Sequence, residues 1–327
     1  MKTEPTQTDA SPANMHIVIE WDLASVDSWY SIYDQIDRTN LVQSYAYAKT
    51  MRKKHAMQTR FGVIKDADTM RVLGLVQVQV FKLAFYLRIR IDRGPLWLSN
   101  VSDEQRAEFW RQINRVYPKK FGTRRHILPE AVESRKNLQM MSDAGFEKKV
   151  DGYQTIWLDL RCELDSLRAK MKKSWRNALG KAERSGLKIY ADPDAKNLEH
   201  LLFHYTKDRA GKGYAGPSPK FIRAMESFKG SADHSIIFSA ENNGKPCAEI
   251  YIWCHGPAAT YQIGWSNIDG RDTNAHYLLL WQAVSYLKQA GVKSLDLGGI
   301  DPDDAEGITR FKSGMGGEVF KTVGRYI

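Results

Sequence analysis

Cysteine is scarce in this chain of 327 residues, and the three that occur, Cys162, Cys247 and Cys254, show no C-x-x-C spacing. A disulfide framework uses an even set of cysteines, and structural zinc sites use closely spaced thiolates, so the sequence indicates neither. We therefore expect a protein of a reducing cytoplasm, without a metal site.

Long apolar runs are also missing. No stretch approaches the roughly eighteen uninterrupted apolar residues of a membrane-spanning helix. The first fourteen residues have no apolar core, so we expect residues 1–14 to form a disordered tail rather than a signal peptide. These absences predict a cytoplasmic protein and leave open a peripheral contact with the inner membrane face.

Positive charge is what the chain has in excess. There are 48 Lys and Arg residues against 38 Asp and Glu residues, which gives a formal net charge of +10. This balance favours polyanionic partners such as RNA, nucleotide phosphates or an anionic membrane face, and it does not choose among them. A hydrophobic content of 43% is ordinary for globular proteins, and the length suits two domains.

One order of predicted elements occurs twice along the chain. In each half a hairpin is followed by a strand, a helix and a further strand. The first copy comprises a hairpin within 61–81, a strand over 87–97, a helix over 103–117 and a strand over 125–128. The second comprises a hairpin around Asn243 and Gly244, a strand over 260–265, a helix over 276–289 and a strand over 293–297. The sequence therefore predicts an internal duplication with an offset of about 170 residues.

The stretch 294–317 has the strongest signs of a functional site. It begins as a buried strand with Asp296 and breaks at Gly298 and Gly299, where the backbone can turn sharply or approach a ligand. A short helical segment then carries Lys312. Glycine-rich backbone and a cation near a strand end suit the stabilisation of a developing oxyanion, although a plain turn and a solvated lysine are the common alternative.

A run of cations lies between the two copies, over residues 162–188. Its apolar residues, Trp175 among them, recur at helical spacing, so we expect one cationic amphipathic helix. Lys172, Lys173 and Arg176 on this helix are candidates for contact with a phosphate backbone. An ordinary solvated helix face is the alternative.

The duplication and the closing motif together resemble the Fem family of aminoacyl-tRNA-dependent peptidyltransferases, which are built from two acetyltransferase-like (GNAT) domains. The resemblance is most specific at Gln43-Ser44-Tyr45 with Lys49, at Arg93-Gly94-Pro95, and from Tyr261 through Ala275-His276-Tyr277-Leu278 and Asp296-Leu297-Gly298-Gly299 to Phe311-Lys312. It implies an α/β (α+β) fold of two tandem GNAT-like domains, here over residues 15–155 and 156–327.

The resemblance also implies an activity, the transfer of an amino acid from a charged tRNA to an amine, usually on a peptidoglycan precursor. No cofactor or metal is then expected, aminoacyl-tRNA is the co-substrate, and the protein is expected to be a monomer. Lys312, Tyr261 and Asp296 are the implied catalytic residues. Substrate contacts are expected from Tyr45, Lys49, Arg93, Gly298, Gly299 and Phe311, and tRNA contacts from Lys172, Lys173 and Arg176.

Two departures from the family pattern concern the acceptor. Leu128-Pro129 stands where better-known members carry an acidic residue before the proline, and Tyr214-Ala215-Gly216-Pro217 stands where some carry a cation. The acceptor pocket is therefore expected to suit another amine.

Two other functions remain open from the sequence. An N-acyltransferase that uses acyl-CoA would share the fold, but the Gln/Arg-x-x-Gly-x-Gly/Ala loop that holds its pyrophosphate is not found. A non-catalytic protein that binds RNA or a membrane surface would explain the charge, and it leaves the motif around Lys312 without a role.

Overall fold

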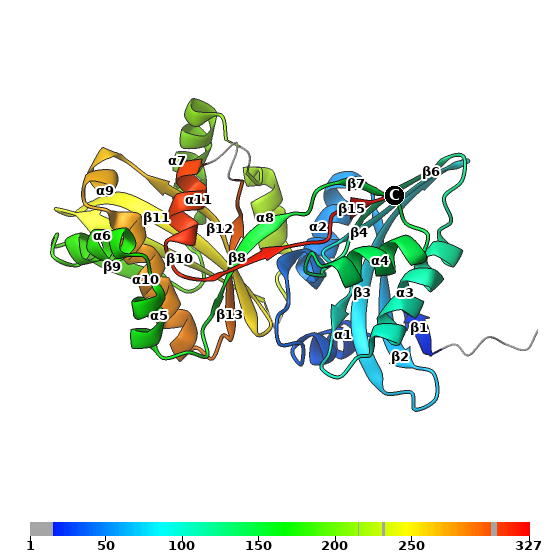
Figure 1. Ribbon diagram of the computed structural model, residues 1–327. Coiled ribbons are helices and arrows are strands. Elements are labelled where there is room, and N and C mark those ends of the chain that lie inside the picture. The colour runs from blue at the N-terminus through cyan, green and yellow to red at the C-terminus, as the bar shows by residue number, and fades with distance from the viewer. Residues whose placement is uncertain (1–15, 215, 231–232, 302–305) are drawn as a thin grey trace, which may run out of the picture.

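Two β-sheets, each with helices against it, lie side by side in this protein (Figure 1). The structure, a computed structural model, describes residues 16–214, 216–230, 233–301 and 306–327. The predicted tail over residues 1–14 and residues 302–305 of the stretch 294–317 lie outside the described residues.

Helices and strands follow the predicted order closely. In the first half they are β1 (Ile17–Trp21), α1 (Val26–Tyr33), the 3-10 helix η1 (Leu41–Gln43), α2 (Tyr45–His55), β2 (Gln58–Asp66), β3 (Val72–Leu83), β4 (Tyr86–Asp92), β5 (Leu96–Trp97), α3 (Asp103–Val116), β6 (Thr123–Leu128), α4 (Arg135–Asp143), β7 (Lys148–Val150) and β8 (Gln154–Asp159). In the second half they are α5 (Leu164–Lys170), α6 (Lys173–Glu183), β9 (Lys188–Asp192), α7 (Leu198–Lys212), α8 (Pro219–Ser227), β10 (Asp233–Asn242), β11 (Lys245–His255), β12 (Ala258–Ser266), α9 (Ile268–Asp272), α10 (Ala275–Gln289), β13 (Ser294–Gly299), α11 (Glu306–Ser313), β14 (Glu318–Lys321) and β15 (Arg325–Tyr326).

The two sheets have the same topology. The strand order of the first is β1-β2-β3-β4-β6-β15-β7, with β5 paired to β3, and that of the second is β14-β8-β13-β12-β11-β10-β9. Each sheet has a parallel pair formed by a strand before its long helix and the strand after that helix. The pair is β4 with β6 around α3 in the first sheet, and β12 with β13 around α10 in the second. The duplication predicted from the sequence, with two similar α/β units, is confirmed.

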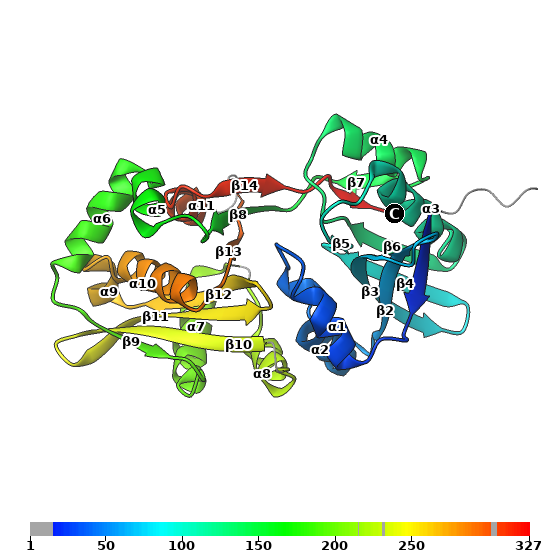
Figure 2. The same ribbon diagram turned by 90° about the horizontal axis from the view of Figure 1, so that it is seen from below.

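The halves exchange one strand each. β15, from the end of the chain, lies between β6 and β7 of the first sheet, and β8 lies between β13 and β14 of the second. Figure 2 shows the chain after β14 passing from the second half to the first, with β8 alongside β14. Each sheet is therefore completed by a strand from the other half.

The residues that form each sheet therefore differ from the two residue ranges that the sequence predicted for the domains. The expected boundary between residues 155 and 156 falls inside β8, all of which pairs in the second sheet. Arg325 and Tyr326, expected in the second domain, pair with β7 and β6 of the first sheet. The sequence of a short strand does not indicate the strand with which it pairs, so the exchange of β8 and β15 could not be predicted.

Alternating side chains divide β3 between a core face and a polar face. Val76 and Val78 are fully buried in the first core, together with Ile89 and Phe109 from β4 and α3. Gln77 and Gln79 point to the opposite face, as the period of two in a strand requires. They are also buried, because α2 and the segment before it cover that face.

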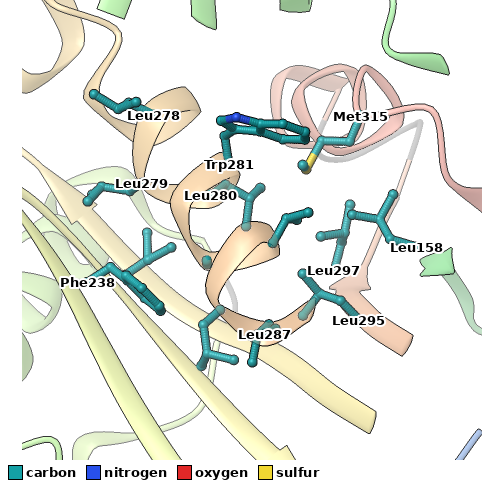
Figure 3. Packing of buried hydrophobic residues seen from close by; sticks show 14 of the residues in the cluster. Leu158, Phe238, Leu278, Leu279, Leu280, Trp281, Leu287, Leu295, Leu297 and Met315 are labelled. Atoms are coloured by element: carbon teal, nitrogen blue, oxygen red, sulfur yellow. The ribbon is translucent and has the colours of Figure 1, made fainter. Parts of the chain in front are cut away.

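Helix α10 forms the centre of the second core. Its leucines and Trp281 pack between the sheet and α11, where they meet Leu295 and Leu297 of β13 and Met315 (Figure 3). Because β13 is held on one side by this core, its other buried residues, Asp296 among them, face the opposite side of the sheet. The packing of α10 thus fixes where the polar side chains of β13 point.

The cationic segment over residues 162–188 is two helices rather than the single one predicted. α5 ends at Lys170 and α6 starts at Lys173, and Met171 and Lys172 between them are extended. Hydrogen bonds to the end of α11 hold this break: the Lys172 amide donates to the carbonyl of Gly314 at 2.9 Å, and Trp175 Nε1 donates to that of Phe311 at 3.0 Å. Tertiary hydrogen bonds outweigh the helical periodicity here.

The predicted strand over 87–97 is likewise divided into β4 and β5 by Arg93, Gly94 and Pro95.

Among the described residues, no helix is long and apolar enough to cross a membrane.

The exchange of β15 makes a prediction about stability. Tyr326 is buried in the first core, so Tyr326→Ala should lower the free energy of unfolding by about 3 kcal/mol or more. Tyr190→Ala, on the edge strand β9 where the side chain is 49% exposed, is the matched control and should change it by less than about 0.5 kcal/mol. Urea denaturation followed by circular dichroism measures both. Equal effects of the two substitutions would show that the exchanged strand contributes little.

Candidate active site

A cleft of about 650 Å³ lies between the two halves. The ends of the parallel strands β4 and β6 lie on one side of the cleft. Residues 260–262 within β12 and the end of β13 lie on the other side, and the start of α8 covers the cleft. It is lined by Leu41, Val42, Tyr47, Arg90, Asp92, Arg93, His126, Leu128, Tyr153, Gly216, Pro217, Ser218, Phe221, Thr260, Tyr261, Gln262, Asp296, Gly298, Gly299 and Lys312. Six residues predicted for the site are among these: Arg93, Tyr261, Asp296, Gly298, Gly299 and Lys312.

Arg93 joins the two halves at the base of the cleft. Its Nε and Nη2 donate to the two carboxylate oxygens of Glu130 at 2.8 and 2.9 Å, and its Nη1 donates to Asp296 Oδ2 at 2.7 Å. Arg93 and Glu130 belong to the first half and Asp296 to the second. Burial by itself would lower the pKa of Arg93, but the two carboxylates outweigh it and hold that pKa well above its usual value.

Gln43 from the predicted motif and Asn40 just before it hold the backbone around Arg93. Gln43 Nε2 donates to the carbonyl of Asp92 at 2.7 Å, and Asn40 Nδ2 donates to that of Arg93 at 2.7 Å. A Cβ on Gly94 would lie 2.7 Å from Gln43 Nε2, so only glycine fits there. The Gln43 motif and the Arg93-Gly94-Pro95 motif, far apart in sequence, therefore form one structural unit that orients the guanidinium of Arg93.

Asp296 has donors on both carboxylate oxygens. Besides Arg93 on Oδ2, the hydroxyl of Thr155 and the amide of Gly298, the latter at 2.8 Å, donate to Oδ1. Thr155 comes from the exchanged strand β8. With 1% of its surface exposed and three donors in place, Asp296 is suited to holding its neighbours in position.

Gly298 shapes the strand end beside Lys312. Its φ is +76°, which is unfavourable for any residue with a side chain, and a Cβ there would lie 3.4 Å from Lys312 Nζ. The turn presents the carbonyl of Gly299, which accepts a hydrogen bond from Lys312 Nζ at 2.8 Å. The glycine pair predicted to break the strand is thus part of β13 and holds the lysine.

Lys312 is 8% exposed and enters the cleft from α11. Its Nζ lies 5.8 Å from the centre of the Tyr261 ring. Burial lowers the pKa of Lys312 to about 8, and the carboxylate of Asp296 opposes this shift. The ammonium form therefore predominates near neutral pH, with proton release within reach.

Tyr261 lines the same wall of the cleft. Burial raises the pKa of its hydroxyl well above the usual value, so the hydroxyl stays protonated. A Cβ on Gly264 would lie 2.5 Å from this oxygen and 3.1 Å from His276 Nε2, which places both groups around Gly264. The ring of Tyr261, rather than an ionised oxygen, is thus what faces Lys312.

A buried histidine missed in the sequence supports the cleft from behind. The Thr39 hydroxyl donates to the carbonyl of His255 at 2.6 Å, so His255 Nδ1–H donates to that hydroxyl at 3.1 Å, and Nε2 accepts from the Thr260 hydroxyl at 2.7 Å. Burial lowers the pKa of His255 to about 3, which keeps the ring neutral. Thr260 itself lines the cleft.

The first half supplies a polar wall opposite Lys312. Asp92 accepts from Arg90 Nε and lies 3.1 Å from His126 Nε2. Arg90 and His126 are paired across β4 and β6, so their side chains share one face of the sheet. This wall offers cationic and hydrogen-bonding groups to a substrate, and the sequence analysis did not single it out.

Three predicted substrate residues lie elsewhere. Lys49 lines a separate pocket on α2 with its Nζ 4.9 Å from the Tyr45 ring centre, and Tyr45 packs against Phe61. Phe311 packs between Trp175 and Tyr277 in the second half. The structure does not bring these three to the interdomain cleft.

The predicted tRNA residues lie around the break between α5 and α6. Lys172 and Lys173 are exposed. Arg176 Nη1 donates to the carbonyls of Met171 and of Ala169, the latter at 3.1 Å, so its guanidinium terminates α5. Arg176 therefore has a structural role at the end of α5.

Glu130 and Thr155 are two further site residues that sequence reasoning missed. Glu130 directly follows the predicted strand end at Leu128-Pro129, which is the one signal that could have drawn attention to it. Thr155 carries no such signal, because its neighbours are set by the strand exchange. In the part of the chain that the structure describes, no cluster of three His, Cys, Asp or Glu residues could hold a metal ion.

Comparison with known proteins agrees with this architecture. The model of the FemAB family matches residues 222–327, which include β12, β13 and Lys312. A search of curated proteins found no match.

Solved structures extend the similarity to the whole chain. The crystal structure of FemX has a TM-score of 0.77 at 12% identity, covering 94% of this chain and 96% of FemX. A conserved protein of unknown function from Bacteroides thetaiotaomicron scores 0.59 at 13% identity, with 94% and 98% covered. A tandem GNAT protein from the clavulanic acid biosynthesis pathway scores 0.51 at 14% identity, also with 94% and 98% covered.

At these identities the structures establish the fold, which is that of tandem GNAT-like proteins. The family match lies over the wall of the cleft that carries Tyr261, Asp296 and Lys312. The chain is thus similar to the FemAB family over residues 222–327 and has a fold like that of FemX over nearly its whole length.

Proposed function

We propose that the protein transfers an amino acid from aminoacyl-tRNA to the amine of an envelope precursor, such as a peptidoglycan precursor, or of a related small molecule. The family supports an aminoacyltransferase in general. The single observation that carries the proposal is the buried Lys312 ammonium, held beside Gly298 and Gly299 in a cleft that both halves form.

The reaction joins the acceptor nitrogen to the carbonyl carbon of the ester, and the bond to the ribose oxygen breaks. Negative charge develops on the carbonyl oxygen before that bond breaks. A fixed ammonium in a partly desolvated cleft stabilises this charge more in the transition state than in the ground state, which is the condition for acceleration. The pKa of Lys312, about 8, also suits it to pass a proton to the departing oxygen and to regain one from the amine.

Asp296 and Arg93 act in this scheme as positioning residues. Both are held by partners within the protein: Arg93 by Glu130 and Asp296, and Asp296 also by Thr155 and the amide of Gly298. The acceptor is expected against the opposite wall, where Arg90 and His126 suit an anionic group.

An acyl-CoA donor is the second candidate, because the fold is shared. In such enzymes the pyrophosphate is held by free backbone amides where a strand leads into a helix. Here the short helix α9 follows β12, and the Asn267 side chain accepts from the amide of Gly270 at 2.9 Å. An amide already capped in this way is a poor phosphate ligand, which favours the tRNA donor.

One experiment separates these candidates. The protein is incubated with an acceptor pool and either charged tRNAs or acyl-CoA esters, and the acceptors are analysed by mass spectrometry. An added aminoacyl mass with tRNA supports the proposal, and an added acyl mass with acyl-CoA supports the alternative. Retention of tRNA without any product would indicate a binding protein.

The first prediction for the site concerns the charge of Lys312. Lys312→Met keeps the apolar stem and removes the ammonium, so turnover should fall on the order of a hundredfold, about 3 kcal/mol. The melting temperature should not fall, because burial disfavours the ammonium in the folded state. The exposed Lys245→Met, in the hairpin of β10 and β11, is the control. Turnover of Lys312→Met within a few-fold of the parent would exclude an electrostatic role.

A second prediction concerns pH. If the ammonium is the active form, turnover should fall as pH rises through about 8, the pKa of Lys312. Lys312→Arg stays charged, so its residual turnover should lack this fall. The free energy of unfolding should instead increase from about pH 8 to about pH 10.5. The pKa of Lys312 in the folded protein is below the ordinary 10.5, so the unfolded chain binds more protons in this pH range. A turnover that rises through pH 8 would instead identify Lys312 as a general base.

A third prediction concerns tRNA binding by the segment between α5 and α6. Reversal of Arg176 would also remove its hydrogen bonds to Ala169 and Met171, so the test uses only Lys172→Glu with Lys173→Glu. This double variant should bind tRNA more weakly. The slope of log affinity against log salt should become shallower by about 0.7 to 0.9 for each phosphate that the two lysines neutralise. Lys245→Glu is the control, and an unchanged slope would contradict the predicted role.

A further inference from the structure

Three apolar side chains are exposed at the end of the first sheet that is remote from the cleft. Leu83 and Phe85 flank the turn between β3 and β4, and Phe121 lies in the loop between α3 and β6. They are 65%, 81% and 94% exposed, respectively. Exposed apolar side chains that gather on one part of a protein surface mark an interaction site. We refer to Leu83, Phe85 and Phe121 as the aromatic tip.

The two loops lie against each other. β4 and β6 pair in parallel with Leu87 opposite Thr123, and the amide of Leu87 donates to the carbonyl of Gly122 at 2.8 Å. A Cβ on Gly122 would lie 2.5 Å from the carbonyl oxygen of Phe85 and 3.7 Å from its ring. The aromatic tip is therefore one surface, built from two segments that pair next to it.

Cations surround the aromatic tip. The sequence has no Asp or Glu within residues 81–90 or 115–129. Five exposed cations flank the apolar side chains: Lys82, Arg88, Lys119, Lys120 and Arg124. Lys119 pairs with Glu147 at 2.8 Å, whereas the other four have no carboxylate partner in the described part of the chain.

The fold itself does not require an exposed tip. In the second half the corresponding turn between β11 and β12 is Gly256-Pro257. A Cβ on Gly256 would lie 2.8 Å from an Asp34 oxygen and 3.1 Å from the Tyr33 ring, so that turn is covered by the end of α1. Exposure is specific to the first half.

We propose that the aromatic tip docks on the surface of an anionic lipid bilayer. Aromatic and aliphatic side chains enter the interfacial region, while the surrounding lysines and arginines meet the lipid phosphates. Leu83 beside the rings favours lipid over nucleic acid, because an aliphatic side chain offers no face on which a base can stack. The occupant is thus a bilayer with negative headgroups.

Docking in this way leaves the cleft outside the bilayer and close to it. The tip and Asp92 are at opposite ends of β4, which at about 3.3 Å per residue spans roughly 20 Å. The docking does not depend on which acceptor or donor is used, so it can be tested by binding alone.

Co-sedimentation with vesicles tests the proposal. The full chain should bind vesicles of phosphatidylcholine and phosphatidylglycerol in equal parts, and bind pure phosphatidylcholine far more weakly. Phe85→Ser with Phe121→Ser should reduce the partition coefficient by about tenfold for each ring removed. Phe203→Ser is the matched control, because Phe203 is 54% exposed with Lys207 Nζ 4.1 Å from its ring centre, yet lies on α7.

A fluorescent label gives a second readout that folding defects do not mimic. Phe121→Cys in a Cys162→Ser background, carrying an environment-sensitive dye, should shift its emission to the blue on anionic vesicles. The same dye at Phe203→Cys should not shift.

Equal vesicle binding by the tip variant and the Phe203 variant, or no blue shift at position 121, would overturn the proposal. A tip variant that binds tRNA less tightly while the parent ignores vesicles would assign the surface to RNA instead.

Discussion

The constraint on which the site depends is the burial of the Arg93 guanidinium between carboxylates from different halves of the chain. A buried charge is costly unless its partners lie in good geometry, and Glu130 and Asp296 provide them. The orientation of Asp296 fixes the turn at Gly298, and that turn presents the carbonyl that holds Lys312. A charge that neither half could bury by itself thus sets the geometry of the cleft.

Strand exchange makes this charge network a property of the whole chain. β8 completes the second sheet and brings Thr155 to Asp296, while β15 completes the first sheet. Separation of the halves would therefore break two sheets as well as the buried ion pairs. A cleft held in this way is preorganised, which is what electrostatic stabilisation of a transition state requires, because the protein dipoles need not move during the reaction.

Local patterns predicted the part of the site that lies in one stretch, and Arg93 and Tyr261 were predicted only from the family resemblance. Asp296, Gly298 and Lys312 share one strand–turn–helix segment, so their common place in the cleft could be predicted from sequence. Glu130 could not be assigned, because its partner Arg93 lies 37 residues away, just after β4. Phe311 was predicted to contact substrate, but neighbouring residues on a helix point about 100° apart, and Phe311 faces Trp175 rather than the cleft.

The duplication offers its own comparison for Lys312. Gly145 and Gly316 both have positive φ, and their amides donate to Ser142 and Ser313 at the ends of α4 and α11. Met141 precedes Ser142 as Lys312 precedes Ser313, and Met141 is buried in the first core. In the first half, the fold thus places the unbranched apolar side chain of Met141 at the position that corresponds to Lys312. An ammonium in the other copy is not needed to form this turn, and burial lowers its own pKa, which agrees with the proposed role of Lys312 in offering charge to a substrate.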